Sequence, residues 1–334
     1  MVAGEVIRWG WFGVIPAPCT VRTTRTGRVE RGESAVTFTA DPTSLVRRPV
    51  WPRILLGGLA LWVAAVAVTF ITANLNLIPT IVLLGSFLVP VTFVAWAWER
   101  RETGELTPGL ILTAFTAGGV LGVCAASVLE AYLLRPSPWL FLGVGLIEEA
   151  AKLAALAIFT RRLVVRSVRD GMILGATVGF GFAAFESAGY AFTALFTVEG
   201  LSLRQVVETE VLRGLLAPFG HGLWTAILGG AFFAAWRAGR FALTGRLVLA
   251  YLGVSLLHAL WDWMHDIALG LTWLLTEPRY APTPYGWLEV PTQTQVNLFT
   301  ALQWGGWALI SAGGIAWLVT MWRHATNYQR RTLT

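Results

Sequence analysis

The chain has 334 residues, of which 55% are hydrophobic and 13% are charged, whereas an average soluble domain carries about 25% charged residues. Two cysteines are too few for a disulfide framework or a cysteine-built zinc finger. The net charge of +6 comes from arginines that lie between apolar runs, which membrane orientation explains better than a nucleic-acid partner does. We therefore predict a membrane protein with no nucleic-acid partner.

The chain begins with a polar segment. Residues 1–50 are rich in arginine and threonine and lack a long apolar run, which predicts a cytoplasmic tail rather than a signal peptide. Residues 51–334 contain apolar runs of about 18 or more residues, the length that crosses a bilayer. We predict an all-α polytopic transmembrane bundle with about eight spans, at residues 54–75, 78–98, 107–133, 138–160, 171–197, 212–236, 245–270 and 297–322.

Arginines cluster in alternate loops of this bundle. They occur in the N-terminal tail, in the loops after the second, fourth and sixth spans, and at the C-terminal end, whereas the other loops have few or none. Under the positive-inside rule this pattern places both termini of a multi-pass cell-membrane protein in the cytoplasm. Before the sixth span, residues 198–211 predict an amphipathic helix at the membrane interface.

The fourth span holds the chain's one lysine, Lys152, one turn after Glu148 and Glu149. Ionisable residues inside a span each cost a few kcal/mol by insertion scales, so they are usually paired and usually functional. The i,i+4 and i,i+3 spacings let both carboxylates reach the lysine. Two carboxylates against one lysine leave a net negative charge that needs another partner, although a purely structural ion pair is the alternative.

Other unusual polar residues lie at a similar predicted depth. Glu186, His221 and His258 fall in the fifth, sixth and seventh spans, and Asp262 follows His258 by one helical turn. At about 1.5 Å per residue, Glu149 and Glu186 lie roughly 16 Å below the outer end of their spans, His221 roughly 14 Å and His258 roughly 18 Å. Antiparallel helices would thus bring these side chains into one polar layer.

Small residues mark the fifth span as a packing surface. Gly175, Gly179, Gly181 and Gly189 predict close approach of neighbouring helices, as small residues permit in membrane bundles. By contrast, Arg213 at the outer end of the sixth span is expected to reach the headgroups. Glu130 is expected at the interface without a catalytic role.

Four motifs in order make the chain resemble a known family. They are EEAAK at 148–152, FAAFE at 182–186, the run from Arg213 to HGLWT at 221–225, and HALWD at 258–262. The chain resembles the PrsW family of intramembrane proteases and, more distantly, the CAAX prenyl-protease and bacteriocin-immunity group. The resemblance covers roughly residues 138–268, the predicted catalytic core. It implies hydrolysis of a peptide bond in a membrane-anchored protein substrate, such as an anti-sigma-factor-like regulator, within the lipid bilayer.

The resemblance also assigns roles to individual residues. It implies a catalytic function for Glu148, Glu149, Glu186, His221, His258 and Asp262, and an orienting or charge-balancing function for Lys152. The prenyl-protease group has a histidine at the position of Glu186, so mechanisms argued for that group do not transfer intact.

Glutamate, aspartate and histidine are ligand types that zinc accepts, although no H-E-x-x-H unit is present. We predict that His221, His258 and one carboxylate, Glu186 or Asp262, bind a zinc-like ion. Glu149, or Glu148, would then take a proton from water. A metal-free version, in which a Glu–His pair activates water and the other histidine stabilises the oxyanion, remains open.

Two other functions fit the same polar layer. Carboxylates and histidines inside a membrane also serve proton-coupled transporters, although the sequence has no inverted repeat. In a non-catalytic partner protein, the polar residues would only hold helices together.

Overall fold

The structure is a computed structural model that describes residues 49–101, 104–164, 166–237, 240–277, 280–283 and 286–333. The predicted tail over residues 1–50 lies outside the described residues, apart from its last two positions. The division of the chain into this tail, a membrane domain and a core at 138–268 stays a prediction.

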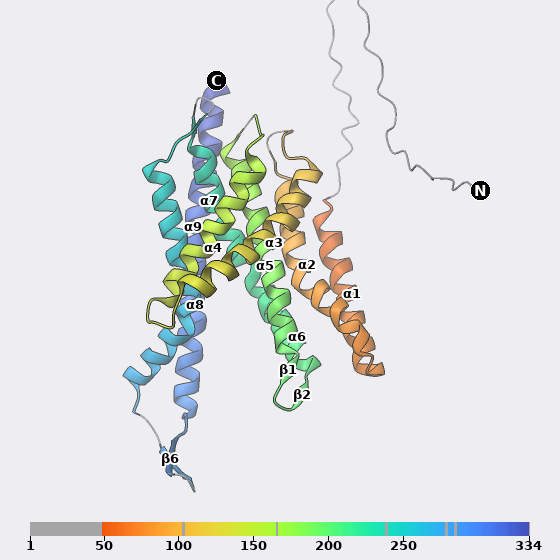
Figure 1. Cartoon of the computed structure of the whole chain (residues 1–334), viewed down its shortest axis with the longest axis vertical. Helices are drawn as coiled ribbons and strands as arrows, with labels where there is room; N and C mark the ends of the chain where they lie inside the picture. The colour runs from red at the N-terminus through yellow and green to blue at the C-terminus, as the bar shows by residue number, and fades with distance from the viewer. Residues whose placement is uncertain are drawn as a thin grey trace, which may run out of the picture. The chain divides into compact units, whose positions relative to one another are not determined.

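The described part of the chain is almost entirely helical (Figure 1). Seven of its helical segments are long and apolar enough to cross a membrane. A further helix, α4, has 21 residues, which is long enough for a span. It is not one of the seven apolar segments, because it contains three charged residues, Glu148, Glu149 and Lys152. The predicted all-α multi-pass fold is therefore confirmed. The helices are α1 (Trp51–Thr72), α2 (Ile78–Trp98), α3 (Pro108–Leu133), α4 (Leu140–Thr160), α5 (Val168–Ala194), α6 (Leu203–Leu216), α7 (His221–Ala234), α8 (Gly245–Leu275) and α9 (Gln293–Leu333), with the 3-10 turns η1 (Leu75–Leu77) and η2 (Ala217–Phe219).

Short antiparallel hairpins join some of these helices. Strands β1 (Phe196–Thr197) and β2 (Gly200–Leu201) connect α5 to α6, and β3 (Trp236–Arg237) and β4 (Arg240–Phe241) connect α7 to α8. A longer hairpin of β5 (Tyr280–Thr283) and β6 (Gly286–Glu289), with Tyr280 opposite Glu289, lies between α8 and α9.

Hydroxyl side chains define where several helices begin. The side chains of Thr107, Ser167, Ser202 and Thr244 accept hydrogen bonds from backbone N–H groups in the first turns of α3, α5, α6 and α8. Such caps satisfy donors that would otherwise lack a partner at a helix start. They fix the register in which the polar residues farther along each helix are presented.

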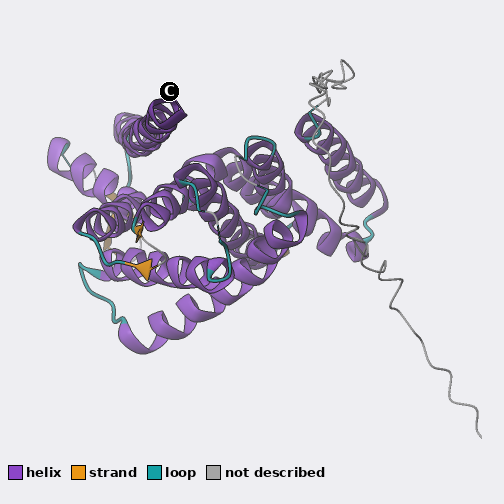
Figure 2. Cartoon of the chain, turned by 90° about the horizontal axis from the view of Figure 1, so that it is seen from above, coloured by secondary structure: helices purple, strands orange, loops and turns teal. Residues whose placement is uncertain are grey.

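Helix α5 forms the centre of the bundle. In its most apolar window 83% of the residues are buried, against 6% for α1 and for α9. It packs against α3 and α7, and α3 runs obliquely across the bundle (Figure 1). The helix that ends at the C-terminus stands at the margin when the structure is seen from above (Figure 2). The apolar surfaces of α1 and α9 are therefore left for lipid, while α5 is shielded from it.

Glycines permit the close approach of α5 to its neighbours. A Cβ atom added at Gly175 would lie 3.0 Å from the Cα of Gly229 on α7. One added at Gly119 on α3 would lie 3.0 Å from the Cα of Gly181. Glycine thus allows backbones to touch on two sides of α5. The prediction for Gly189 is wrong, because a Cβ atom there would meet nothing within 4 Å.

The predicted span over 212–236 falls almost entirely within Leu203–Ala234, a segment that is long and apolar enough to cross a membrane, but this segment is not one continuous helix. Helix α6 ends at Leu216, the turn Ala217–Phe219 follows, and α7 starts at His221. Gly220 has φ −102° and ψ −129°, which is not helical. The predicted interfacial helix at 198–211 instead starts at Leu203 and belongs to this broken segment. A break at membrane depth is tolerated only where protein or a cavity surrounds it.

We expect Gly175→Ala to destabilise the bundle, because the added methyl group would meet the α7 backbone. Overpacking of this kind costs about 1–3 kcal/mol. Gly189→Ala on the same helix is the matched control and should leave stability unchanged or slightly raised. Unfolding of both variants in detergent micelles checks the prediction, and equal midpoints would contradict it.

Candidate active site

Lys152 lies at the centre of a buried ionic cluster. Its side chain is fully buried, and its Nζ donates to Glu148 Oε2 at 3.0 Å and to Glu149 Oε1 at 2.9 Å. The same nitrogen lies 2.8 Å from His221 Nδ1 and 4.0 Å from the centre of the Phe182 ring. The pairing that the i,i+3 and i,i+4 spacings predict is therefore present, and it extends across to α7.

His221 is the first residue of α7, directly after the break at Gly220. Its Nε2 donates to Glu186 Oε2 on α5 at 3.1 Å. Its Nδ1 faces α4, at 3.8 Å from Glu148 Oε2. A hydrogen bond from Nε2 leaves the lone pair on Nδ1, so the tautomer directs this lone pair toward Glu148 and Lys152.

His258 on α8 has a similar arrangement with the nitrogens exchanged. Its Nδ1 donates to Glu149 Oε1 at 3.2 Å, while its Nε2 lies 3.6 Å from Glu148 Oε2 and 3.3 Å from Asp262 Oδ2. The ring stacks on Trp224 with centroids 4.7 Å apart. The indole and Glu149 together hold the imidazole in one orientation.

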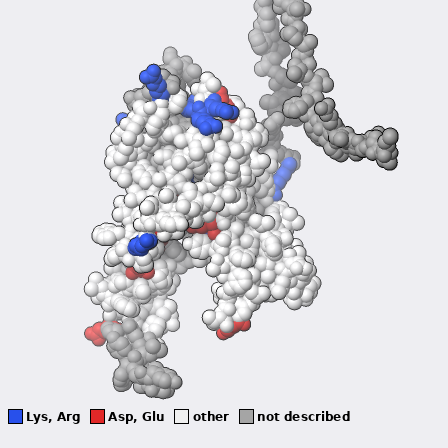
Figure 3. Space-filling model, in the orientation of Figure 1, with Lys and Arg blue, Asp and Glu red and all other residues white. Residues whose placement is uncertain are grey.

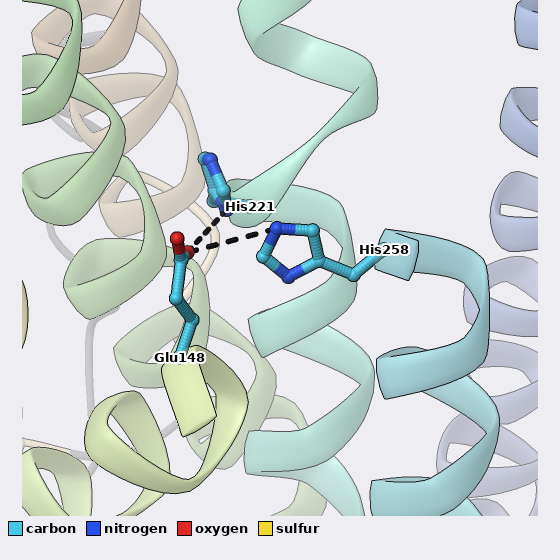
Figure 4. A group of neighbouring side chains, drawn as sticks. All are labelled: Glu148, His221 and His258. Carbon is cyan, nitrogen blue, oxygen red and sulfur yellow. Dashed lines mark ion pairs between the residues drawn. The ribbon is translucent and has the colours of Figure 1, made fainter. Parts of the chain in front are cut away.

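Glu148, His221 and His258 form a group that could hold a metal ion, since one ligand atom from each lies within 4.8 Å of the others. Figure 4 shows these side chains converging from three helices. In a tetrahedral zinc site with bonds of about 2.0–2.1 Å, ligand atoms lie about 3.3 Å apart. The distances from Glu148 Oε2 to the two histidine nitrogens, 3.8 and 3.6 Å, are close to this spacing.

The ring nitrogen of each histidine that points away from Glu148 also has the kind of partner found in metal sites. Glu186 accepts from one ring and Glu149 from the other, and ligand histidines almost always donate in this way to a carboxylate, a carbonyl or water. The sequence favoured Glu186 or Asp262 as the carboxylate ligand. In the structure Glu148 Oε2 lies near one nitrogen of each histidine, Glu186 contacts the other nitrogen of His221, and Asp262 Oδ2 lies 3.3 Å from His258 Nε2.

Arg213 belongs to the site and does not extend to the headgroups as expected. Its Nη2 donates to Glu186 Oε2 at 2.6 Å and its Nε donates to Ser187 Oγ at 2.7 Å. The guanidinium also lies 4.3 Å from the centre of the Tyr190 ring. Arg213 therefore holds the carboxylate that in turn orients His221.

A cavity of about 380 Å³ opens beside this cluster. Its walls come from α3, α4, α5 and α8, and they include Glu130, Glu148, Glu186 and Asp262. Glu130, which the sequence placed at the interface without a catalytic role, thus lines the same cavity as Glu148, Glu186 and Asp262. Its place in α3 gives its depth, but no pattern in the sequence shows which way the side chain faces. A smaller cavity of about 220 Å³ shares Glu186 and Asp262 and continues toward Arg213 and Trp307. The two cavities adjoin at Glu186, Tyr190 and Asp262.

We expect Lys152→Met to destabilise the protein strongly, because Glu148 and Glu149 would lose their buried counter-charge. Removing one partner of a buried ion pair costs about 3–5 kcal/mol. Arg204→Met is the matched control, since Arg204 and Glu208 form an i,i+4 pair at the surface and should contribute nothing measurable.

A double variant shows whether the lost stability comes from an unpaired charge or from altered packing. Adding Glu149→Gln to Lys152→Met should recover part of the lost stability, because one unpaired charge disappears. Unfolding midpoints in detergent report both effects. Equal losses in the Lys152 and Arg204 variants would mean that the buried cluster does not hold the fold together.

Comparison with known proteins identifies the chain's family. A family model described as PrsW family intramembrane metalloprotease matches residues 106–282, which is more than half of the 334-residue chain. Neither the curated proteins nor the solved structures yield a match. The matched segment contains all of α3 to α8 and with them every residue of the cluster around Lys152. The chain belongs to the PrsW family of intramembrane proteases.

Proposed function

We propose that this intramembrane protease hydrolyses a peptide bond of a membrane-anchored protein with the help of a zinc-like ion. Glu148, His221 and His258 would hold the ion. The observation that supports this most is the meeting of their three ligand atoms within 4.8 Å, with a carboxylate on the far nitrogen of each histidine. When bound, such an ion supplies Lewis-acid chemistry, which polarises a carbonyl and makes water more acidic.

Glu149 is better suited to orient His258 than to accept a proton from water. Its side chain is fully buried and does not line the cavity. It accepts hydrogen bonds from Lys152, from His258 and, at 3.3 Å, from Thr225 Oγ1. Three donors stabilise the charged carboxylate and make it a poor base. We therefore assign it to positioning, where the sequence alone favoured it as the base.

Asp262 is the best placed proton acceptor. It lines both cavities, its side chain is 29% exposed, and its Oδ2 lies 3.3 Å from His258 Nε2. Glu186 also faces the cavities, but Arg213 and His221 both donate to its Oε2. Asp262 would take a proton from the attacking water as the new C–O bond forms. It would return that proton to the amide nitrogen as the C–N bond breaks.

The family supports proteolysis over the transporter and the non-catalytic partner protein that the sequence left open. The side chains of Lys152, Glu149 and His258 are buried, while Asp262 stays accessible to a substrate. A substrate segment would have to be extended locally to present its peptide bond, because a helical backbone keeps its carbonyl groups hydrogen-bonded. A membrane-anchored regulator of the anti-sigma-factor kind is a suitable substrate class.

The proposed ligands can be tested by metal content. We expect purified protein to contain stoichiometric zinc, and His221→Ala and Glu148→Gln to lose it. Glu149→Gln should keep a weakened site, with its affinity for zinc reduced about 10–100-fold, because this change removes only the carboxylate that accepts a hydrogen bond from His258 Nδ1. Glu208→Gln, at the surface, is the control. Full cleavage by metal-free, chelator-treated protein would refute the metal-assisted mechanism and favour the Glu–His alternative.

The proposed base can be separated from the ligands. Asp262→Asn should reduce cleavage by about 10²–10⁴-fold, the usual contribution of a positioned acid or base, and leave the bound metal in place. Asp266→Asn, one turn farther along α8 and exposed, is the matched control. Fragments of membrane proteins are compared by mass spectrometry in cells that produce each variant. Loss of metal from Asp262→Asn would make Asp262 a ligand instead.

A further inference from the structure

Glu130 is a carboxylate that the proposed chemistry does not use. It lies in the last turn of α3 and lines the 380 Å³ cavity together with Glu148, Glu186 and Asp262. Its Oε1 is buried and has no hydrogen-bond partner among the described residues. A buried polar atom without a partner is costly, so a group that binds in the cavity would find an acceptor here.

Three basic side chains in this region have other partners. Lys152 donates to Glu148 and Glu149, and Arg213 donates to Glu186 and Ser187. Arg135, five residues beyond Glu130, donates to the backbone carbonyls of Ala131 and Leu134. Within the described residues, no basic side chain is thus paired with Glu130.

The charge balance of the site supports the same conclusion. The cavity and the cluster beside it contain five carboxylates, from Glu130, Glu148, Glu149, Glu186 and Asp262. Lys152 and Arg213 contact three of these carboxylates, those of Glu148, Glu149 and Glu186. Inside a membrane protein ionisable groups are normally paired, and Oε1 of Glu130 has no hydrogen-bond partner among the described residues.

The space around Glu130 is open to a substrate side chain. A second hollow shares Ser127, Glu130 and Val144 with the cavity and continues past Arg135 and Leu140 toward the end of α3. The space-filling view shows acidic atoms at mid-height, surrounded by uncharged ones (Figure 3). A long side chain could therefore reach Glu130 while the backbone beside it lies against Glu148.

We propose that Glu130 is a specificity-determining residue that binds a lysine or arginine side chain of the substrate, close to the peptide bond that is cut. This inference rests on the proposed function, because it places the substrate in the same cavity. A metal ion is a poorer occupant, since Glu130 belongs to no group of converging ligand atoms among the described residues. The amine of a lipid headgroup has the same chemistry, but the position of Glu130 beside Glu148 favours the substrate.

Binding can be measured without cleavage. The probes are two fluorescent transmembrane peptides of leucine and alanine that differ only in a central Arg or Gln. The full-length His221→Ala protein, inactive under either mechanism, is reconstituted in phosphatidylcholine vesicles. We expect the Arg peptide to bind about ten-fold more tightly, the effect of a partly buried charge pair. Adding Glu130→Gln should abolish the preference, while Glu130→Asp should retain part of it.

Control variants and lipids distinguish the alternatives. Glu208→Gln removes the same charge at the surface and should leave the preference for Arg unchanged. An unchanged preference in the Glu130→Gln variant would overturn the proposal. If phosphatidylethanolamine displaces the Arg peptide only when Glu130 is present, the site binds a lipid amine, which would also overturn it.

Profiling of cleavage sites separates this proposal from the proposed function. In wild-type protein, cut membrane proteins should show Lys or Arg at one fixed distance from the cut, and Glu130→Gln should remove that enrichment while cleavage continues. If wild-type protein cleaves membrane proteins without any such enrichment, the proposed role of Glu130 is refuted, but the proteolytic mechanism is not. An Arg preference in binding with no cleavage by the wild-type protein would refute the proteolytic mechanism and leave the cationic site in place.

Discussion

The structure depends on how two adjacent glutamates are kept charged inside an apolar helix. Lys152 neutralises part of the charge of Glu148 and Glu149 on the same helix. Further hydrogen-bond donors to Glu149 come from other helices, from Thr225 on α7 and His258 on α8. Because unpaired ions are so costly in a membrane, α7 and α8 must pack where they can supply these partners. The same contacts that hold the helices together also assemble the site.

Close packing and a broken helix make this assembly possible. Gly175 and Gly229 let α5 and α7 approach until their backbones touch. The interruption at Gly220 places His221 at the start of α7, where its ring can reach both α4 and α5. A continuous helix would present the same side chain along its flank. The irregular backbone is therefore a means of aiming one imidazole, and the surrounding helices shield it from lipid.

In the site, each histidine donates a hydrogen bond to a carboxylate that orients its ring. Glu186, itself held by Arg213, fixes the outward nitrogen of His221, and Glu149 fixes that of His258. Both inward nitrogens then face Glu148. Such preorganisation reduces the rearrangement that ligand binding or proton transfer requires. It also fits the excess of carboxylates over basic side chains in this cluster, since Glu186 and Glu149 each accept a hydrogen bond from a histidine.

The sequence alone determined the spans and the depth of their polar residues. Hydrophobic runs must match the bilayer, so the number of residues from a span's end gives the depth of Glu149, Glu186, His221 and His258. Depth was enough to predict that these groups meet. It does not give the rotation of a helix about its axis, which depends on side-chain packing with its neighbours. Only the tertiary structure could therefore decide that Glu148 faces both histidines, that α7 starts at His221, and that Glu130 lines the cavity beside Glu148.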